Sequence, residues 1–467
     1  MLDEDQAATI ARDLWTRQLT EQPRFDKFAE YFAGRRGIPD VEPGASEELK
    51  ELARISVKNV LPMIIESFNS NLSVTGYRTK DNAEQDAGWE WWQQQRLDAR
   101  QDEVHRPCLK YGVSYLRILP ELDEEIGRVV GQATPRSPRQ LFTMYENPEA
   151  DRWPVYALDQ WVEATSSGSS TRRALLIDDE ASYPMDLGNV PIGQVVGDPN
   201  QAIPRMPITV RQIDEPMPHD RGHCPVVRFI NERDPEQMLT GEIEPLIVPQ
   251  RALNAANFDR LSLARFGAYP QKVIIGWTGK TREETLRAAA SRVWAFEDGD
   301  VKAQTLQPGS IGPYNELIEE MIEHIATVAQ VPVANVTGKM VNLSAEALAA
   351  ANSIQQRKIV GKRDSLGESW EQAIAEGAAI SGIKTDPSAE VIWRNTDVQP
   401  YATVIDGIVK LQSAGIPIEV LVQDVPGWTQ QQIQQARNAI ASGEDVQQMI
   451  SSILQPATPP TPTGAAA

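Results

Sequence analysis

The stretch most suggestive of chemistry is Gly279-Lys280-Thr281, which follows a short apolar run and precedes a helical pattern. This order imitates the loop that cradles nucleotide phosphates. That loop also needs a glycine five residues before Gly279, where this chain has Ile274. Glu283 and Glu284, just beyond, would face the triphosphate with like charge. The sequence therefore argues against a nucleotide-dependent DNA motor, and ATP hydrolysis by the chain would reverse this interpretation.

Histidines and cysteines form two small groups that could ligate a metal. One group is His219, His223 and Cys224, and the other is His105 with Cys108. Each offers too few ligands for a structural zinc, and no pair of cysteines two residues apart completes either group. The motifs of serine hydrolases and zinc proteases are also missing. The sequence predicts no catalytic residue, no cofactor and no metal site, so the chain is not expected to be an enzyme.

Acidic triplets are the remaining candidates for metal-dependent chemistry. Asp123-Glu124-Glu125 and Asp178-Asp179-Glu180 carry adjacent carboxylates of the kind that bind divalent cations. A nuclease would need carboxylates that converge from separate strands, which these triplets do not indicate. Solvated turns explain them better.

The overall charge limits how the chain can meet nucleic acid. With 45 Lys and Arg against 65 Asp and Glu, the formal net charge is -20. Such a field repels DNA in bulk and excludes a wrapping or groove-binding mode, whereas a channel that lets DNA slide remains compatible with it. The two cysteines suggest a reducing compartment, and no apolar run approaches the ~20 residues of a membrane span. We expect a cytosolic chain with no membrane partner.

Two helical segments separated by a polar loop form the centre of the chain. Apolar residues from Leu317 to Ala329 recur at three- and four-residue spacing, which predicts one buried face. Pro313 and Pro332 mark the ends of this first helix. After the polar loop, a second helical pattern begins at Ser344 and reaches Ile380, a length of about 55 Å if it is continuous. The carboxylates of the first helix fall on its opposite side: Glu316, Glu319, Glu320 and Glu323.

The remaining pattern indicates an α+β chain. Helices are expected over residues 3–34, from Ser46 and over Gln250–Phe266, and strands between Val113 and Ile230. The expected strands are Ser114–Leu119, Trp153–Leu158, Trp161–Ala164, Arg173–Ile177, Ile208–Ile213 and Pro225–Ile230. Two strands, Val273–Gly276 and Val301–Leu306, flank a helix at Thr281–Arg292. A strand at Ala389–Trp393 precedes helices at Ala402–Ser413, Ile418–Asp424, Gln430–Ala441 and Asp445–Leu454.

Several short sequence motifs, and their order along the chain, resemble those of the portal proteins of tailed bacteriophages. These motifs are Val331-Pro332 with the glycine of the next loop, Asn342–Leu348, Val57–Met63, Val74–Arg78, Trp89–Gln93, Tyr111–Tyr115 and Phe266–Gly276. The branch they resemble is the siphophage type found in phages of actinobacteria. The resemblance runs from about Leu49 to Gly382.

The resemblance implies the portal fold and its division into parts. The fold has a mixed α/β wing, a two-helix stem, a small α/β clip, a tunnel loop followed by a long helix, and an α-helical crown. The expected boundaries are 1–242 for the N-terminal helices and wing, 243–267 for the first stem helix, 268–312 for the clip, 313–331 for the second stem helix, 332–343 for the tunnel loop, 344–398 for the long helix and wing return, 399–455 for the crown and 456–467 for a disordered tail.

The resemblance also implies a function without hydrolysis. Portal subunits form a ring, usually of twelve copies, at one vertex of the capsid. Double-stranded DNA is packaged through the ring and later ejected through it. The partners implied are further copies of the chain, the large terminase subunit, a head–tail connector or adaptor, and the major capsid and scaffolding proteins. The chain would be in the host cytoplasm during assembly and then in the virion. A different virion subunit, such as an adaptor or capsid protein, is the alternative, and a nuclease or motor is a weaker one.

Particular residues take roles by this resemblance. Tunnel-loop residues that face DNA would be Val336, Thr337, Gly338, Lys339, Met340, Val341 and Asn342, and the carboxylates of Glu316, Glu319, Glu320 and Glu323 would line the tunnel. Clip residues that contact terminase or connector would be Thr278, Lys280, Arg282, Glu283 and Arg287. The basic cluster Arg357, Lys358, Lys362 and Arg363 fits either DNA phosphates or acids of a neighbouring subunit, and we favour the neighbouring subunit.

Overall fold

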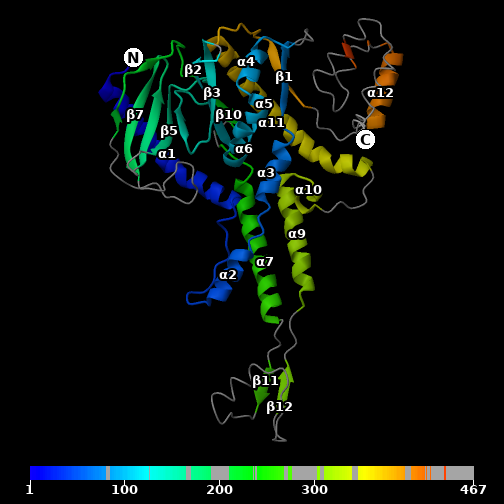
Figure 1. The fold of residues 1–467 in the computed structure, drawn as a ribbon. Helices are drawn as coiled ribbons and strands as arrows, with labels where there is room; N and C mark the ends of the chain where they lie inside the picture. The colour runs from blue at the N-terminus through cyan, green and yellow to red at the C-terminus, as the bar shows by residue number, and fades with distance from the viewer. Residues whose placement is uncertain are drawn as a thin grey trace, which may run out of the picture.

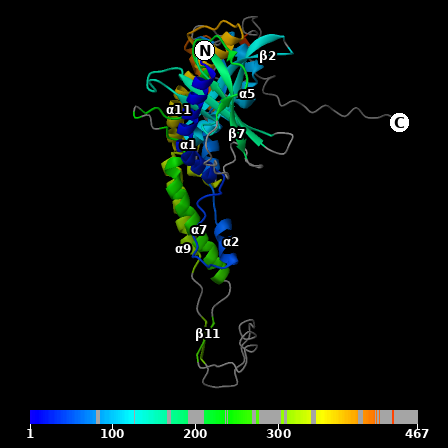
Figure 2. The ribbon, with the colours of Figure 1, turned by 90° about the vertical axis from the view of Figure 1, so that its left-hand side faces the viewer.

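The computed structural model gives the chain an elongated shape, with a broad body at one end, two helices below it and a small pair of strands at the far end (Figures 1 and 2). The α+β fold predicted from the sequence is confirmed. The structure describes residues 1–79, 85–125, 127–164, 170–190, 210–234, 236, 239–267, 272–275, 302–305, 310–338, 345–394, 401–415, 417, 421 and 436–437.

Helices form most of the N-terminal part of the body. The first, α1 (Glu4–Phe32), starts at a capping box in which Asp3 and Gln6 exchange hydrogen bonds, and it continues through Pro23. The helix expected from Ser46 is two helices, because Pro62 starts a new one. The helices that follow α1 are α2 (Glu47–Ile55), α3 (Leu61–Asn69), α4 (Gly88–Gln94), α5 (Leu97–Arg100) and α6 (Asp102–Tyr111).

The wing consists of two antiparallel sheets. The first has the order β10-β2-β3, from β2 (Val113–Asp123), β3 (Arg128–Arg136) and β10 (Val226–Ile230). The second joins β4 (Leu141–Met144), β5 (Tyr156–Ala164), β6 (Ser170–Ile177), β7 (Ala181–Val190), β8 (Arg211–Gln212) and β9 (Met217–Pro218). The first half of α1 packs its apolar stripe, including Ala7, Ala11 and Leu14, on the second sheet.

Several wing strands differ from the sequence prediction. The two strands expected as Trp153–Leu158 and Trp161–Ala164 are one strand, β5. Strands β3, β4 and β7 were not predicted, because a proline interrupts β3 and β7 and because β4 has only four residues. Hydrogen bonding to neighbouring strands overrides such weak local signals.

The stem is an antiparallel pair of helices, α7 (Ile247–Gly267) and α9 (Gly312–Ala329), which pack along each other (Figure 1). Both stem helices lie within two to four residues of the predicted bounds. Beyond them, β11 (Lys272–Ile275) pairs with β12 (Lys302–Thr305), which confirms the two predicted strands of the clip. The predicted helix Thr281–Arg292 lies outside the described residues.

The long helix is confirmed and crosses the body. It is α11 (Ala345–Ile380), 36 residues without a break, so Gly361 and Gly367 do not interrupt it. After it, β13 (Ala389–Trp393) pairs with β1 (Val74–Thr79), and α12 (Tyr401–Ser413) follows. The other three predicted C-terminal helices and the tail lie mostly or wholly outside the described residues.

Tryptophans hold α11 in the core of the body. Trp91 and Trp92 of α4 and Trp370 of α11 are fully buried, and the rings of Trp92 and Trp370 meet edge to face at 4.9 Å. Trp89, the third tryptophan of α4, is partly buried and packs against the same core. No helix in the described part of the chain combines the length and apolarity that a bilayer crossing requires.

Candidate functional site

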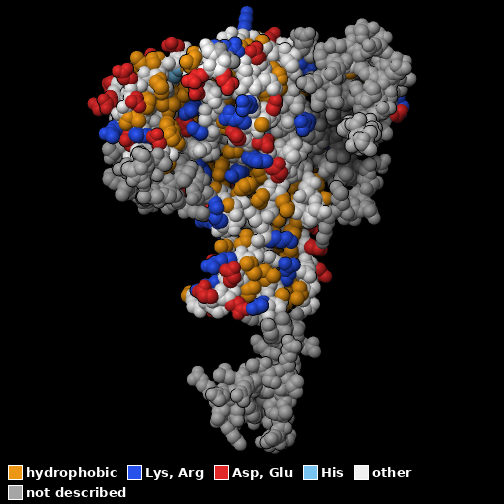
Figure 3. Space-filling view, viewed as in Figure 1, with side chains coloured by type: hydrophobic (Ala, Val, Ile, Leu, Met, Phe, Trp, Pro, Cys, Tyr) orange, Lys and Arg blue, Asp and Glu red, His pale blue; other side chains and the backbone are white. Residues whose placement is uncertain are grey.

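The acidic side of α9 is the clearest candidate surface. Ile318, Ile322 and Ile325 are buried against the body and α7, as the helical spacing predicts. The four carboxylates at Glu316, Glu319, Glu320 and Glu323 are exposed. Asp and Glu side chains are seen along the edge of the stem that α9 forms (Figure 3). The structure therefore places these four residues together on one solvent-facing strip.

Polar side chains of α7 fix the stem to the N-terminal segment. Asn257 donates to the backbone oxygen of Ser56 at 2.6 Å. Gln250 and Asn254 make similar hydrogen bonds to the segment 37–60. Between the stem helices, Arg260 donates to Asn315 at 3.2 Å. These buried amide hydrogen bonds hold α2 against one side of α7.

The segment that follows Pro332, which the resemblance implies to be the tunnel loop, is partly helical, and this corrects the prediction of a loop. Residues Val333–Thr337 form α10, and Gly338 ends it with φ of 66°. Val336 is only 6 % exposed and belongs to the hydrophobic core, so it does not face DNA as predicted. Thr337 is half-buried and its hydroxyl donates to the backbone oxygen of Val333. The other predicted loop residues, Lys339, Met340, Val341 and Asn342, lie outside the described residues.

The predicted clip contacts cannot be placed in the same way. Thr278, Lys280, Arg282, Glu283 and Arg287 are all outside the described residues, as is the Gly279-Lys280-Thr281 sequence. The paired strands β11 and β12 come before and after this segment in the sequence.

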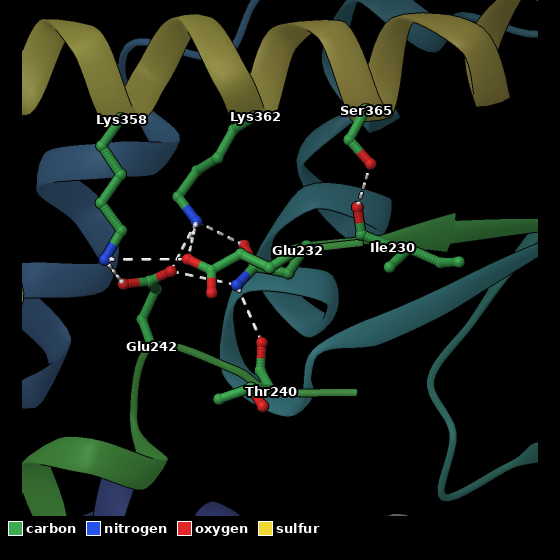
Figure 4. Close-up of polar contacts among 8 residues, drawn as sticks. Ile230, Glu232, Thr240, Glu242, Lys358, Lys362 and Ser365 are labelled. Carbon is green, nitrogen blue, oxygen red and sulfur yellow. Dashed lines mark hydrogen bonds and ion pairs between the residues drawn. The ribbon is translucent and has the colours of Figure 1, made fainter. Parts of the chain in front are cut away.

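A buried cluster of charged side chains lies beside the middle of α11, between this helix and Glu242 (Figure 4). Lys358 donates to Glu242 at 2.6 Å, and Lys362 donates both to Glu242 and, at 2.7 Å, to Asn231. Asn231 also donates to Glu242. Lys362 is 2 % exposed and Glu242 is 4 % exposed. Burial alone would raise the pKa of Glu242, but the Lys362 and Lys358 ammonium groups outweigh it and hold that pKa below its usual value.

This cluster overturns most of the predicted intersubunit role of the basic residues. For Lys362 the prediction is wrong, because its charge is neutralised inside its own chain. Lys358 is committed to the same carboxylate, and Arg363 donates to the backbone oxygens of Asn71 and Arg394. Arg357 is exposed beside these residues, on the rim of an open groove. It alone keeps the predicted position for an intersubunit contact.

The candidates for metal chemistry have structural partners instead. His105 and Cys108 are both fully buried, and His105 Nε2 accepts a hydrogen bond from Trp370 at 2.8 Å. His223 stacks on Trp153 and lies 3.1 Å from Glu376. Within the described part of the chain, no three metal-binding side chains converge.

The acidic triplet at Asp178 also serves the fold. The carboxylate of Asp178 accepts hydrogen bonds from the backbone nitrogens of Glu180 and Ala181 and from the hydroxyl of Tyr183. It therefore shapes the turn between β6 and β7.

His105 gives a prediction about pH. Burial lowers its pKa to about 3, against 6.5 for an unperturbed histidine. The unfolded chain thus takes up a proton below pH 6.5 that the folded chain refuses, and folding stability falls as the pH drops from 6.5 towards 3. The slope is about 1.4 kcal/mol per pH unit. His105→Gln keeps an acceptor for Trp370 but cannot titrate, so unfolding in urea between pH 7 and 5 should depend less on pH. Parallel profiles would contradict this assignment.

Two acidic residues that are the buried partners of basic side chains were not identified from the sequence. Glu242 anchors the lysine cluster, and Glu376 of α11 receives a two-point contact from Arg221 at 2.8 and 3.1 Å. Both are almost completely buried. Glu376 could have been found from the sequence by its position on the apolar side of a predicted helix. Glu242 lies in a segment with no hydrophobic periodicity, so its burial could not be predicted.

Comparisons with known proteins agree with each other. A family model described as phage portal protein, SPP1 Gp6-like, matches residues 12–445. The portal protein of Mycobacterium phage D29 is 23% identical over 366 residues, covering 76% of this chain and 72% of that protein. The portal protein of Mycobacterium phage L5 is 22% identical over 392 residues, with the same coverage.

Solved structures with similar folds come from gene transfer agent (GTA) particles. The neck of an empty GTA particle matches with a TM-score of 0.47 and 14% identity, covering 80% of this chain and 91% of that one. The virion of a native GTA particle matches with a TM-score of 0.45 and 14% identity, covering 83% of this chain and 96% of that one.

Proposed function

Since the chain belongs to the SPP1 Gp6-like family of phage portal proteins, we propose that it assembles into a closed ring, usually of twelve subunits in this family, around a passage for double-stranded DNA. DNA enters the capsid through this passage during packaging and leaves through it during ejection. The chain acts mechanically: it shapes the passage and carries out no hydrolysis itself. The subunit is made in the host cytoplasm and becomes part of the virion.

The exposed acidic strip of α9 carries this proposal. Its four carboxylates, Glu316, Glu319, Glu320 and Glu323, lie on one side of a helix whose other side is packed on the body. Repeated around a ring, the strip would form an acidic wall. DNA phosphates are repelled by such a wall, so the duplex slides without adhering. This is the behaviour that a passage for DNA requires.

The other parts take the roles that fit their positions. The clip, with Thr278, Lys280, Arg282, Glu283 and Arg287, would contact the large terminase subunit and later the head–tail connector. The residues after α10, from Gly338 to Asn342, would narrow the passage, with Lys339 touching phosphates weakly. The body would meet the capsid and scaffolding proteins, and the residues 399–455 would form the crown.

Electron microscopy of the purified chain tests the ring. Class averages down the symmetry axis should show closed rings of about a dozen subunits with a central hole wide enough for a duplex. Rings or shells without such a hole would favour another virion subunit. A chain that stays monomeric at high concentration and hydrolyses ATP would overturn the proposal.

Neutralising the acidic strip tests what the passage does. A variant with Glu316, Glu319, Glu320 and Glu323 all changed to Gln should still form rings, because all four side chains are exposed. These rings should retain linear duplex DNA several-fold better at low salt, and the difference should fade by about 0.5 M salt. The matched control changes the exposed Glu121, Glu124, Glu125 and Glu215 of the wing to Gln, for the same change in net charge. Equal DNA retention by both variants would contradict an acidic wall.

A further inference from the structure

One side of α9 carries no acidic residue and is only partly packed on the body. Leu317, Met321, His324 and Val328 follow at spacings of four, three and four residues, so they share one side of the helix. Leu317 is 39 % and Val328 is 36 % exposed, and Met321 is partly buried. The isoleucines that pack inward and the carboxylates of the acidic strip occupy the other two sides. Within the described part of the chain, Leu317 and Val328 stay exposed, so this apolar strip is only partly covered.

The neighbouring helix α7 continues this surface. Val248 is 74 % exposed, and Ala252 and Ala255 are exposed on the same side of α7. The opposite side of α7 holds α2, through Asn257 and its neighbouring amides. At about 100° per residue, the exposed residues of both helices fall on the side of the stem away from α2. We call Val248, Ala252, Ala255, Leu317, Met321 and Val328 the apolar stem face.

The helix α2 stands out from the other side of the stem (Figure 2). It is amphipathic: Leu52 and Ala53 are buried towards the stem, while Ile55 at its end is 59 % exposed. In the described residues, the stem therefore has a partly exposed apolar surface on one side and a projecting helix with an exposed isoleucine on the other.

We propose that the apolar stem face docks against α2 of the adjacent copy of the same chain. The inference rests on the proposed ring. In a cyclic ring each subunit uses two different surfaces, one towards each neighbour, so the docking surfaces must lie on opposite sides of the subunit. The apolar stem face and α2 meet this condition. The acidic strip lies between them on the free edge of α9 and stays open to the passage.

Residues that meet across such an interface must also lie at one level of the stem, because cyclic symmetry involves no shift along the axis. Asn257 binds the backbone of Ser56, next to Ile55, and Arg260 binds Asn315, two residues before Leu317. Ile55 and Leu317 thus lie at nearly the same level on opposite sides of the stem. This pair identifies the contact: Ile55 of one copy against Leu317 of the next.

Disulfide trapping in assembled rings tests the contact directly. The variant Ile55→Cys with Leu317→Cys should give a ladder of covalent multimers after mild oxidation, seen on a non-reducing gel. The native Cys108 and Cys224 are buried and do not interfere. The matched control is Ile55→Cys with Glu320→Cys, which moves the second thiol to the acidic strip one turn away. The control should remain almost entirely monomeric on the gel.

The outcomes separate this inference from the proposed function. Rings in the micrographs with a ladder for the first pair only would support the docking. Rings that give no ladder, or equal ladders for both pairs, would overturn it and leave the ring intact. If the unmodified chain forms no rings, the proposed function fails and the docking fails with it.

A charge substitution gives a second, independent measurement. Leu317→Lys places an ammonium group in the apolar stem face, at a position exposed enough for the single chain to keep its fold. Rings should be lost while the thermal unfolding midpoint of the monomer is unchanged. Glu320→Lys, on the same helix, should leave rings in place. Rings of normal abundance in Leu317→Lys would overturn the docking.

Discussion

Replacing Gly377 by alanine is expected to destabilise the body by at least about 3 kcal/mol, whereas the same change at Gly361 on the same helix is expected to stabilise it. An added Cβ at Gly377 would lie 2.0 Å from Cε2 and 2.2 Å from Cζ2 of Trp91. Trp91 is fully buried, so its ring cannot move aside without displacing other core residues.

The hydrogen bonds around Gly377 increase the cost. Trp91 Nε1 donates to the backbone oxygen of Gly131 at 2.7 Å. Ser381 accepts from the backbone nitrogen of Gly131 at 3.0 Å and donates to the backbone oxygen of Gly377 at 2.7 Å. A shifted Trp91 ring would leave a buried donor and acceptor without partners, which costs about 1–3 kcal/mol. The contact of α11 with α4 and β3 therefore depends on the missing side chain.

The control comes from the same helix. Gly361 is exposed and an added Cβ there meets nothing within 4 Å, so Gly361→Ala should gain about 0.5–1 kcal/mol from helix propensity. Thermal unfolding and soluble yield measure both changes. Should Gly377→Ala fail to fold, the double variant with Trp91→Leu provides the check, because removing the indole gives the methyl group room. Equal behaviour of the two alanine variants would refute the packing argument.

Lys362→Met is the second change with a large expected effect, a loss of about 3–5 kcal/mol at neutral pH. It removes one ammonium group from Glu242, which is only 4 % exposed. Of the two ammonium groups, Lys358 alone then remains to offset the buried carboxylate, beside the neutral amide of Asn231. Arg357→Met, an exposed change on the same helix, should alter the stability by less than about 0.5 kcal/mol. Denaturation followed by tryptophan fluorescence reports both, since Trp370 lies on α11.

The cause can be separated from a general packing defect in two ways. Adding Glu242→Gln to Lys362→Met removes the uncompensated charge, so the double variant should be more stable than the single one. Lowering the pH should also reduce the difference in unfolding free energy between the parent chain and Lys362→Met. The lowered pKa of Glu242 gives the parent chain stability that is present above pH 4.5 and is lost as the pH falls through the folded value. In Lys362→Met, only one ammonium group opposes the effect of burial on the pKa of Glu242, so this pKa is higher than in the parent chain. Protonation of Glu242 at low pH then removes the uncompensated charge and reduces the loss of stability. A difference that is constant with pH would contradict an electrostatic origin.

Much of the stem and of the long helix follows from the sequence alone. The spacing of Ile318, Ile322 and Ile325 sets the buried face of α9, and the carboxylates at Glu316 and Glu320 are exposed as that spacing requires. The strands β11, β12 and β13 also lie within the short segments predicted from apolar runs that are bounded by turn residues. These features depend on interactions within a few residues, which a sequence displays directly.

The burial and the contact partners of individual side chains depend on the tertiary structure. Lys362 has the sequence environment of a solvated basic cluster, yet Glu242, 120 residues earlier, becomes its buried partner once α11 lies across the body. Val336 stands in a polar loop and is buried because α10 packs on α9 and α3. The side of the stem that α2 covers, and with it the side that α2 leaves exposed, depends on the hydrogen bond from Asn257 to the backbone oxygen of Ser56. Helical period and capping act over three or four residues, whereas these contacts exist only after segments far apart in the sequence have been brought together.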